Sequence, residues 1–202
     1  MIEFITSLDN QILLFFNGNH TPFLDELMTI VTGKWIWIPF YILLIDLLFK
    51  RVGPQKGTMV LVAVALAILM TDQICASVIR PIIGRLRPCS PDNPIYQYIT
   101  IVNDIHPKSY SWPSCHAANT FALSTLLSIV FRSKTFTFSI FTWAILVSVS
   151  RIYLGAHYPT DILCGAAFGC FFGYLALVIV NTLSESLPKY YISFRNAKLQ
   201  DE

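Results

Sequence analysis

The chain has 202 residues, of which 54% are hydrophobic and 13% are charged, and its mean hydropathy is +0.58. These values lie outside the range of ordinary soluble domains, so lipid is the expected solvent for much of the chain. The formal net charge of +2 is too small to indicate a nucleic-acid partner. The five cysteines follow no metal-ligand spacing, which argues against structural zinc. No repeat or low-complexity linker divides the sequence, and residues 1–202 are expected to form one domain.

The first seventeen residues have apolar side chains at helical spacing. These are Ile2, Ile5, Leu8, Ile12 and Phe15. The pattern predicts an amphipathic helix that lies in the membrane interface or, equally, a helix packed on the rest of the protein. Glu3 and Asp9 interrupt the stretch, which lacks the basic start and small-residue cleavage site of a signal peptide. Insertion into the membrane is therefore expected to depend on the later segments.

Five longer apolar stretches approach or reach the length of about 20 residues that crosses a hydrocarbon core. They cover approximately residues 23–49, 57–79, 114–131, 135–150 and 160–183. The third and fourth are joined by so short a connection that they must be antiparallel neighbours. The predicted fold is all-α: a polytopic transmembrane bundle of about five spans preceded by the N-terminal amphipathic helix.

The cations of the short loops predict the orientation of this bundle. One side carries Lys50, Arg51, Lys56, Arg132 and Lys134, together with Lys189, Arg195 and Lys198 of the C-terminal tail. The positive-inside rule places that side in the cytoplasm, so residues 80–112 and 150–159 would face outward from the cell (inner) membrane. The outward side nevertheless has several arginines of its own, and this excess calls for a chemical explanation.

Three polar stretches converge on the outward side because antiparallel spans bring their ends to the same surface. They are Arg80–Pro88, Pro113–His116 and Ser150–Asp161. Together they supply three or four guanidinium groups, two imidazoles, a hydroxyl and a carboxylate. A cluster of guanidinium groups suits a phosphate, because the planar donor fork matches its oxygens bidentately.

Two prolines indicate where the helices begin, since proline is favoured at the first position of a helix. If Pro113 takes that position, Ser114, Cys115 and His116 form a first turn whose free backbone N–H groups point at a bound anion. By the same reasoning, Pro159 starts the last span. Asp161 then lies in its first turn and can hold one ring nitrogen of His157.

A histidine held by a carboxylate presents its other nitrogen as a nucleophile or base. The predicted reaction is attack of His157 on phosphorus, with His116 as the general acid for the leaving group and water later hydrolysing the phosphohistidine. The developing charge would be stabilised by a hydroxyl and three guanidinium groups, those of Ser114, Arg80, Arg87 and Arg151.

In these residues the chain resembles the type 2 phosphatidic acid phosphatases, membrane lipid phosphatases related to vanadium-dependent haloperoxidases. The family pattern is K-x6-R-P, P-S-G-H and S-R-x5-H-x3-D. This sequence has Arg80-x6-Arg87-Pro88, Pro113-Ser114-Cys115-His116 and Ser150-Arg151-x5-His157-x3-Asp161, within a matching region of about residues 60–180. The resemblance implies the same catalytic roles for His157, Asp161 and His116, phosphate contacts from the three arginines, Ser114 and the Cys115 backbone, and no required metal or cofactor.

The sequence departs from the family pattern at two positions. Arg80 replaces lysine, which keeps the charge but changes its reach and donor geometry. Cys115 replaces glycine, which restricts the backbone and leaves a thiol beside the pocket. Neither change removes a reacting group, but both are expected to affect substrate preference.

Less specific interpretations apply to other residues. Ser150 is equally suited to a helix-end hydrogen bond and to a ligand contact. Arg85 is expected to contact lipid headgroups, with a substrate contact as the alternative. Asp72 is expected to pair within the bundle, with pairing toward the pocket as the alternative. The long connection over residues 89–110 is typical of a lid or recognition loop.

The predicted function is hydrolysis of a terminal phosphate from a membrane lipid at the outer leaflet. Undecaprenyl diphosphate and lipid A are favoured by analogy over phosphatidylglycerol phosphate and phosphatidic acid. The alternatives are a lipid-phosphate transporter or flippase that binds without hydrolysis, and a vanadate-binding haloperoxidase. The first would place ionisable residues near the midplane, and the second belongs to soluble proteins.

Overall fold

The computed structural model describes residues 2–103 and 109–183, and all regular structure within them is helical. The elements are α1 (Ile2–Gly18), α2 (Pro22–Thr32), η1 (Trp35–Trp37), α3 (Ile38–Val52), α4 (Pro54–Asp72), η2 (Gln73–Ile79), α5 (Arg80–Ile83), η3 (Pro94–Tyr98), α6 (Cys115–Phe131), α7 (Lys134–Tyr153) and α8 (Pro159–Leu183). The tail cations Lys189, Arg195 and Lys198, on which the predicted orientation partly depends, lie outside the described residues.

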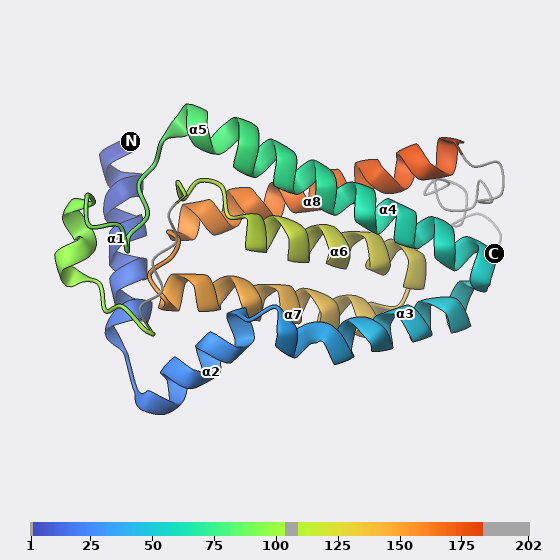
Figure 1. The fold of residues 1–202 in the computed structure, drawn as a ribbon, viewed down its shortest axis with the longest axis horizontal. Helices are drawn as coiled ribbons and strands as arrows, with labels where there is room; N and C mark the ends of the chain where they lie inside the picture. Colours follow the sequence, from blue (N-terminus) through green and yellow to red (C-terminus); the bar gives the residue numbers. More distant parts are fainter. Residues whose placement is uncertain (1, 104–108, 184–202) are drawn as a thin grey trace, which may run out of the picture.

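The long helices run along one axis and form a bundle (Figure 1). The turns between α3 and α4 and between α6 and α7 lie at one end, whereas α1, α5 and η3 gather at the other. Within the described residues, three helical segments are long and apolar enough to cross a membrane, namely Pro54–Ile83, Lys134–Tyr153 and Pro159–Leu183. The bent pair of α2 and α3 adds a fourth candidate, and α6 is a shorter apolar helix. The predicted all-α membrane bundle is confirmed.

The first predicted span, residues 23–49, is not one continuous helix. α2 ends at Thr32, and the segment from Trp35 to Val52 leaves at an angle of 68°. Gly33 adopts an extended conformation that stops α2, and the indole of Trp37 donates a hydrogen bond of 2.8 Å to the carbonyl of Val31. The break therefore places the exposed Lys34 in the loop between the two helical segments rather than within a helix.

The second predicted span continues beyond residue 79. α4 passes into a seven-residue π-helical segment, η2, and then into α5, which ends at Gly84 in the left-handed conformation with φ 64°. The wider π-helical turns rotate the residues that follow them relative to a regular α-helix. Arg80, the first residue of α5, is consequently buried with 8% of its surface exposed.

Helices α6 and α8 approach each other closely through small residues. A Cβ atom added at Gly165 or Gly169 would lie 2.4 Å from the Ser114 carbonyl oxygen or 2.2 Å from that of Ala118. Small residues four positions apart permit this backbone contact between membrane helices. The Ser114 amide also donates a 3.0 Å hydrogen bond to the Asp161 carbonyl. The first turns of α6 and α8 are thereby held in fixed relative positions.

Helix α1 lies across the ends of the other helices (Figure 1). Its buried residues are Asp9, Leu13 and Asn17, spaced four apart, whereas Phe4 and Phe15 are exposed. The helix therefore packs on the bundle through a face that is largely polar and leaves apolar side chains pointing outward. Packing on the bundle, one of the two alternatives from the sequence, is observed; the position of α1 in the membrane interface stays a prediction.

Candidate active site

The three polar stretches predicted to converge do meet at the end of the bundle that carries α1 and α5. Six of their charged and polar side chains are almost completely enclosed, whereas Arg85 and His116 are half-buried. The exposed fractions are 8% for Arg80, 4% for Arg87, 0% for Ser114, 7% for Arg151, 1% for His157 and 0% for Asp161. Burial of so many polar groups is costly unless each finds a partner, so their hydrogen bonds define the site.

His157 is held as the sequence predicted, because α8 begins at Pro159 and places Asp161 in its first turn. The Asp161 Oδ2 atom lies 3.3 Å from His157 Nδ1 and accepts a 2.9 Å hydrogen bond from the Tyr158 amide. On the other side of the ring, Arg87 Nη1 lies 2.9 Å from Nε2. A guanidinium group can only donate, so Nε2 carries the lone pair and Nδ1 carries the proton directed at Asp161.

The charge state of His157 suits a nucleophile. Burial, followed by the positive charges of Arg87 and Arg151, holds the pKa of His157 well below its ordinary value. The imidazole is therefore neutral at neutral pH. Its unprotonated nitrogen faces the guanidinium group that would bind a phosphoryl oxygen, which is the orientation that attack on phosphorus requires.

Arg87 is fixed by three hydrogen bonds to protein. Its Nε donates to the Ser109 carbonyl at 2.7 Å, its Nη2 to the Ser109 hydroxyl at 3.0 Å and its Nη1 to the Ala156 carbonyl at 2.8 Å. Burial, with the nearby charges of Arg80 and Arg151, lowers the pKa of Arg87 to about 10, which leaves it charged at neutral pH. Its donors are thus oriented before any ligand arrives.

Arg80 enters the same cluster from α5. Its Nε and Nη2 donate to the Pro113 carbonyl at 3.1 and 3.0 Å, and Nη1 donates to the Ser109 hydroxyl at 3.4 Å. Arg80 and Arg87 thus meet at Ser109, which belongs to the long connection predicted to be a lid or recognition loop. Sequence reasoning missed Ser109 because nothing in its local pattern distinguishes it from the other polar residues of that loop.

Backbone hydrogen bonds to Arg151 account for the spacing between Arg151 and His157 in the third motif. Its carbonyl accepts hydrogen bonds from the amides of Ala156 and His157 at 3.0 and 3.2 Å, so the turn after α7 brings the histidine back beside the arginine. The Arg151 side chain donates from Nη1 to the Thr32 hydroxyl at 2.7 Å. Its Nε is buried without a hydrogen-bond partner among the described residues. That donor is available to an anion in the cluster.

The start of α6 differs from the prediction. Pro113 is not the first helical residue; Ser114 is the N-cap, in an extended conformation, and its hydroxyl oxygen accepts a 3.4 Å hydrogen bond from the Ala117 amide. A serine oxygen satisfies a free amide at the helix start, which proline cannot do. The first turn therefore consists of Cys115, His116 and Ala117. The amides of Cys115 and His116 have no intrahelical acceptor, as expected for the predicted backbone contact.

The remaining predictions have mixed outcomes. Arg85 is not directed at headgroups: it bonds to Asp9 and Asp161 at 2.7 Å each. Ser150 donates to the Val147 carbonyl at 2.7 Å, which is the helix-end alternative. Asp72 accepts a 2.9 Å hydrogen bond from Asn119 and so pairs within the bundle as predicted.

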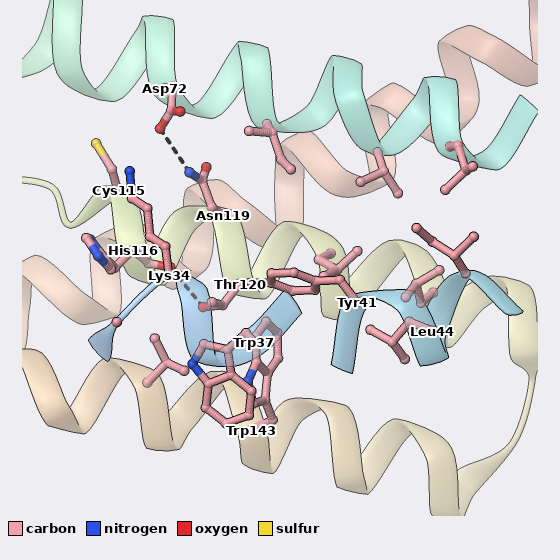
Figure 2. Close-up of a pocket in the computed structure, with 18 of the residues that line it drawn as sticks. Lys34, Trp37, Tyr41, Leu44, Asp72, Cys115, His116, Asn119, Thr120 and Trp143 are labelled. Atoms are coloured by element: carbon pink, nitrogen blue, oxygen red, sulfur yellow. Dashed lines mark hydrogen bonds between the residues drawn. The ribbon is translucent and has the colours of Figure 1, made fainter. Parts of the chain in front are cut away.

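A crevice of about 500 Å³ leads from the site into the bundle between α3, α4, α6 and α7. Figure 2 shows Cys115, His116 and Lys34 at one end of it, with Tyr41 and Leu44 farther along. Lys34 comes from the loop at the bend between α2 and η1. Its signal in the sequence is a lysine after glycine within an otherwise apolar stretch, and sequence reasoning assigned it no role in the site.

Comparison with known proteins agrees with the motifs. The model of the PAP2 superfamily matches residues 59–185. A lipid A 4′-phosphatase of Bacteroides thetaiotaomicron is 44% identical over 187 residues, which cover 93% of this chain and 83% of the relative. A lipid A 4′-phosphatase of Porphyromonas gingivalis is 32% identical, over 86% of this chain and 73% of its own.

A solved structure supports the same fold. The transmembrane PAP2 type phosphatidylglycerolphosphate phosphatase from Bacillus subtilis superposes with a TM-score of 0.65 over 90% of this chain and 89% of its own. Its sequence identity is 23%, so the likeness concerns the architecture.

The first prediction concerns the bond between His157 and Asp161. In Asp161→Asn the uncharged amide no longer fixes the protonated Nδ1 tautomer, so we expect kcat for phosphate release from a lipid substrate to fall by about 10³–10⁴ with little change in KM. Asp46→Asn is the control, because Asp46 pairs with Lys50 on the exposed surface of α3. Retention of kcat within about tenfold in Asp161→Asn would contradict this role.

Proposed function

The chain belongs to the PAP2 superfamily, and we propose that it is an integral membrane phosphatase that removes the 4′-phosphate of lipid A. The observation that carries the proposal is the neutral His157 imidazole, whose Nε2 lies 2.9 Å from the Arg87 guanidinium within a buried cluster of arginines. The 44% identical lipid A 4′-phosphatase supports the choice of substrate.

The geometry supports a two-step reaction. His157 Nε2 attacks phosphorus as the bond between phosphorus and the lipid oxygen breaks, and His116 donates a proton to that oxygen. Water then attacks phosphorus as it gives a proton to His116, the bond between phosphorus and His157 Nε2 breaks, and inorganic phosphate leaves the regenerated imidazole. The guanidinium groups and the first turn of α6 stabilise the negative charge that spreads over the phosphoryl oxygens.

The crevice supports a substrate with hydrocarbon chains. It begins at His116 and continues past Tyr41, Leu44 and Leu123, so a phosphate in the arginine cluster leaves the adjoining apolar chain beside α3, α4 and α6. Lys34 lines the same end of the crevice as His116 and adds a cation for the anionic headgroup. Undecaprenyl diphosphate shares this chemistry and is the second substrate to test.

Location in the cell membrane with the site on the extracytoplasmic side is part of the proposal. Lys50, Arg51 and Arg132 lie at the turns at one end of the bundle, and the site lies at the other end (Figure 1). The positive-inside rule supports a cytoplasmic position for those turns. Concentration of the ionisable groups at one end also favours hydrolysis over transport, which would require a site nearer the midplane.

Phosphate release from a panel of lipids tests the proposed function. Detergent-purified protein would be incubated with lipid A, undecaprenyl diphosphate, phosphatidylglycerol phosphate and phosphatidic acid. We expect release of phosphate, fastest from lipid A and from its 4′ position by mass spectrometry, and no effect of a chelator. His157→Ala should lower the rate by at least about 10⁴, because it removes the nucleophile.

Each contrary result would identify the part of the proposal that fails. Lipid binding without phosphate release would favour the transporter. Faster release from another lipid would overturn the assignment of lipid A while leaving the phosphatase in place.

A substitution within the crevice tests the binding of hydrocarbon chains. Val64 of α4 lines the crevice, whereas Val62 of the same helix is 52% exposed on the outside. Val64→Trp should fill the crevice and lower kcat/KM for a lipid phosphate by about tenfold or more, equivalent to ~1.4 kcal/mol. It should leave hydrolysis of a short water-soluble phosphate ester unchanged, and Val62→Trp should affect neither substrate. Equal losses on both substrates in Val64→Trp would contradict a chain-binding crevice.

A further inference from the structure

The geometry points to Arg85 and Asp9 as positioning residues that act on the nucleophile through Asp161. Neither residue belongs to the spacing that defines the three motifs, and Asp9 lies on α1, before the region of residues 59–185 that the family model matches. The inference rests on the proposed phosphatase activity, because the positioned group is the His157 imidazole.

The two oxygens of Asp161 have different partners. Oδ2 faces His157 Nδ1, as described above, and Oδ1 accepts a 2.7 Å hydrogen bond from Arg85 Nη1. The Arg85 guanidinium also stacks over the Tyr158 ring, with 3.9 Å between its central carbon and the ring centroid. Arg85 therefore fixes the plane of the carboxylate, and with it the direction of the oxygen that orients His157.

Arg85 is fixed in turn by Asp9. Arg85 Nη2 donates a 2.7 Å hydrogen bond to Asp9 Oδ2, and the Asp9 side chain is only 2% exposed. Asp9 Oδ1 accepts a 2.9 Å hydrogen bond from the Thr160 amide, and Oδ2 accepts one from the Thr160 hydroxyl. A carboxylate from α1 thus occupies the start of α8, where free amides and the helix dipole favour negative charge.

The charges of Asp9, Arg85 and Asp161 explain why Asp161 needs a cation other than His157. The site requires a neutral His157 before the reaction, and a buried carboxylate without a compensating charge is strongly unfavourable. Arg85 supplies that charge on the side of Asp161 away from the histidine. Asp9 balances Arg85, so the four groups alternate as carboxylate, guanidinium, carboxylate and imidazole without placing a positive charge on the nucleophile.

Asn17 provides a control that separates this role from simple attachment of α1. Its side chain is completely buried and also fastens α1 to the bundle, by donating to the carbonyls of Tyr153 and Thr100 at 2.7 and 3.0 Å and accepting from the Thr100 amide at 2.8 Å. None of these bonds involves Asp161. If Asp9 only attached α1, loss of either side chain would have the same effect on the reaction.

The test compares kcat, KM and the thermal midpoint of unfolding for Asp9→Asn, Arg85→Gln, Arg85→Lys and Asn17→Ala. The substrate is the lipid phosphate that the wild-type protein hydrolyses fastest. We expect Asp9→Asn and Arg85→Gln to lower kcat by about 10–100-fold with KM within about threefold, as for residues that orient a reacting group. Arg85→Lys should recover part of the loss because it restores the charge. Asn17→Ala should lower the thermal midpoint but keep kcat within about twofold.

A double-variant cycle shows whether Arg85 acts through Asp161. In an Asp161→Asn background, Arg85→Gln should lower kcat by less than about twofold further, because the group it positions has been neutralised. Multiplication of the two separate losses would overturn the inference, as would kcat within about twofold of wild type for both Asp9→Asn and Arg85→Gln. Both outcomes presuppose that the wild-type protein is active. If the proposed function itself were wrong, the wild-type protein would release phosphate from none of the lipids.

Discussion

The structure depends on the concentration of positive charge around one neutral imidazole. Arg80, Arg87 and Arg151 are all buried at one end of an apolar bundle, and their charges oppose protonation of His157. Protein carbonyls and hydroxyls orient these guanidinium groups but do not neutralise them. An anion that enters the cluster therefore gains strong electrostatic stabilisation and meets an unprotonated nitrogen.

The rest of the bundle keeps this cluster rigid. The contact of α6 with α8 through Gly165 and Gly169 fixes the two helix starts that carry His116 and Asp161. The turn after α7 adds His157 to them through the Arg151 carbonyl. Precise placement matters because catalysis by positioning and electrostatics is lost when reacting groups are misplaced by about 1 Å. Gly33 and Lys34, at the bend after α2, line the crevice that begins at His116 and runs between the helices.

Local sequence pattern was sufficient for the parts of the site that depend on chain geometry. Pro159 fixed the start of α8, and the four-residue step from His157 to Asp161 then placed the two side chains in contact. The first helical residue of α6 was predicted two residues too early, at Pro113 instead of Cys115, because the pattern did not weigh capping by the Ser114 hydroxyl against proline at the first position.

Other residues of the site are positioned by tertiary contacts, which no local sequence pattern contains. Asp9 and Arg85 are 76 residues apart in the sequence, and their ion pair exists because α1 folds across the start of α8. In the sequence Asp9 only interrupts the apolar pattern of the first seventeen residues, whereas in the structure it lies on the buried face of α1. Lys34 lies at the site because of the break after α2, and Ser109 lies there because it contacts Arg80 and Arg87. Composition alone reveals neither position.

Direct identification of the phosphorylated residue tests the central claim of nucleophilic attack by His157 Nε2. Lipid phosphate labelled with radioactive phosphorus would be mixed with the purified protein, the reaction stopped in alkali within one turnover, and the labelled peptide sequenced by mass spectrometry. The account predicts phosphohistidine at residue 157, with the label lost in His157→Gln. Label on His116, or full catalytic turnover by His157→Gln, would contradict it.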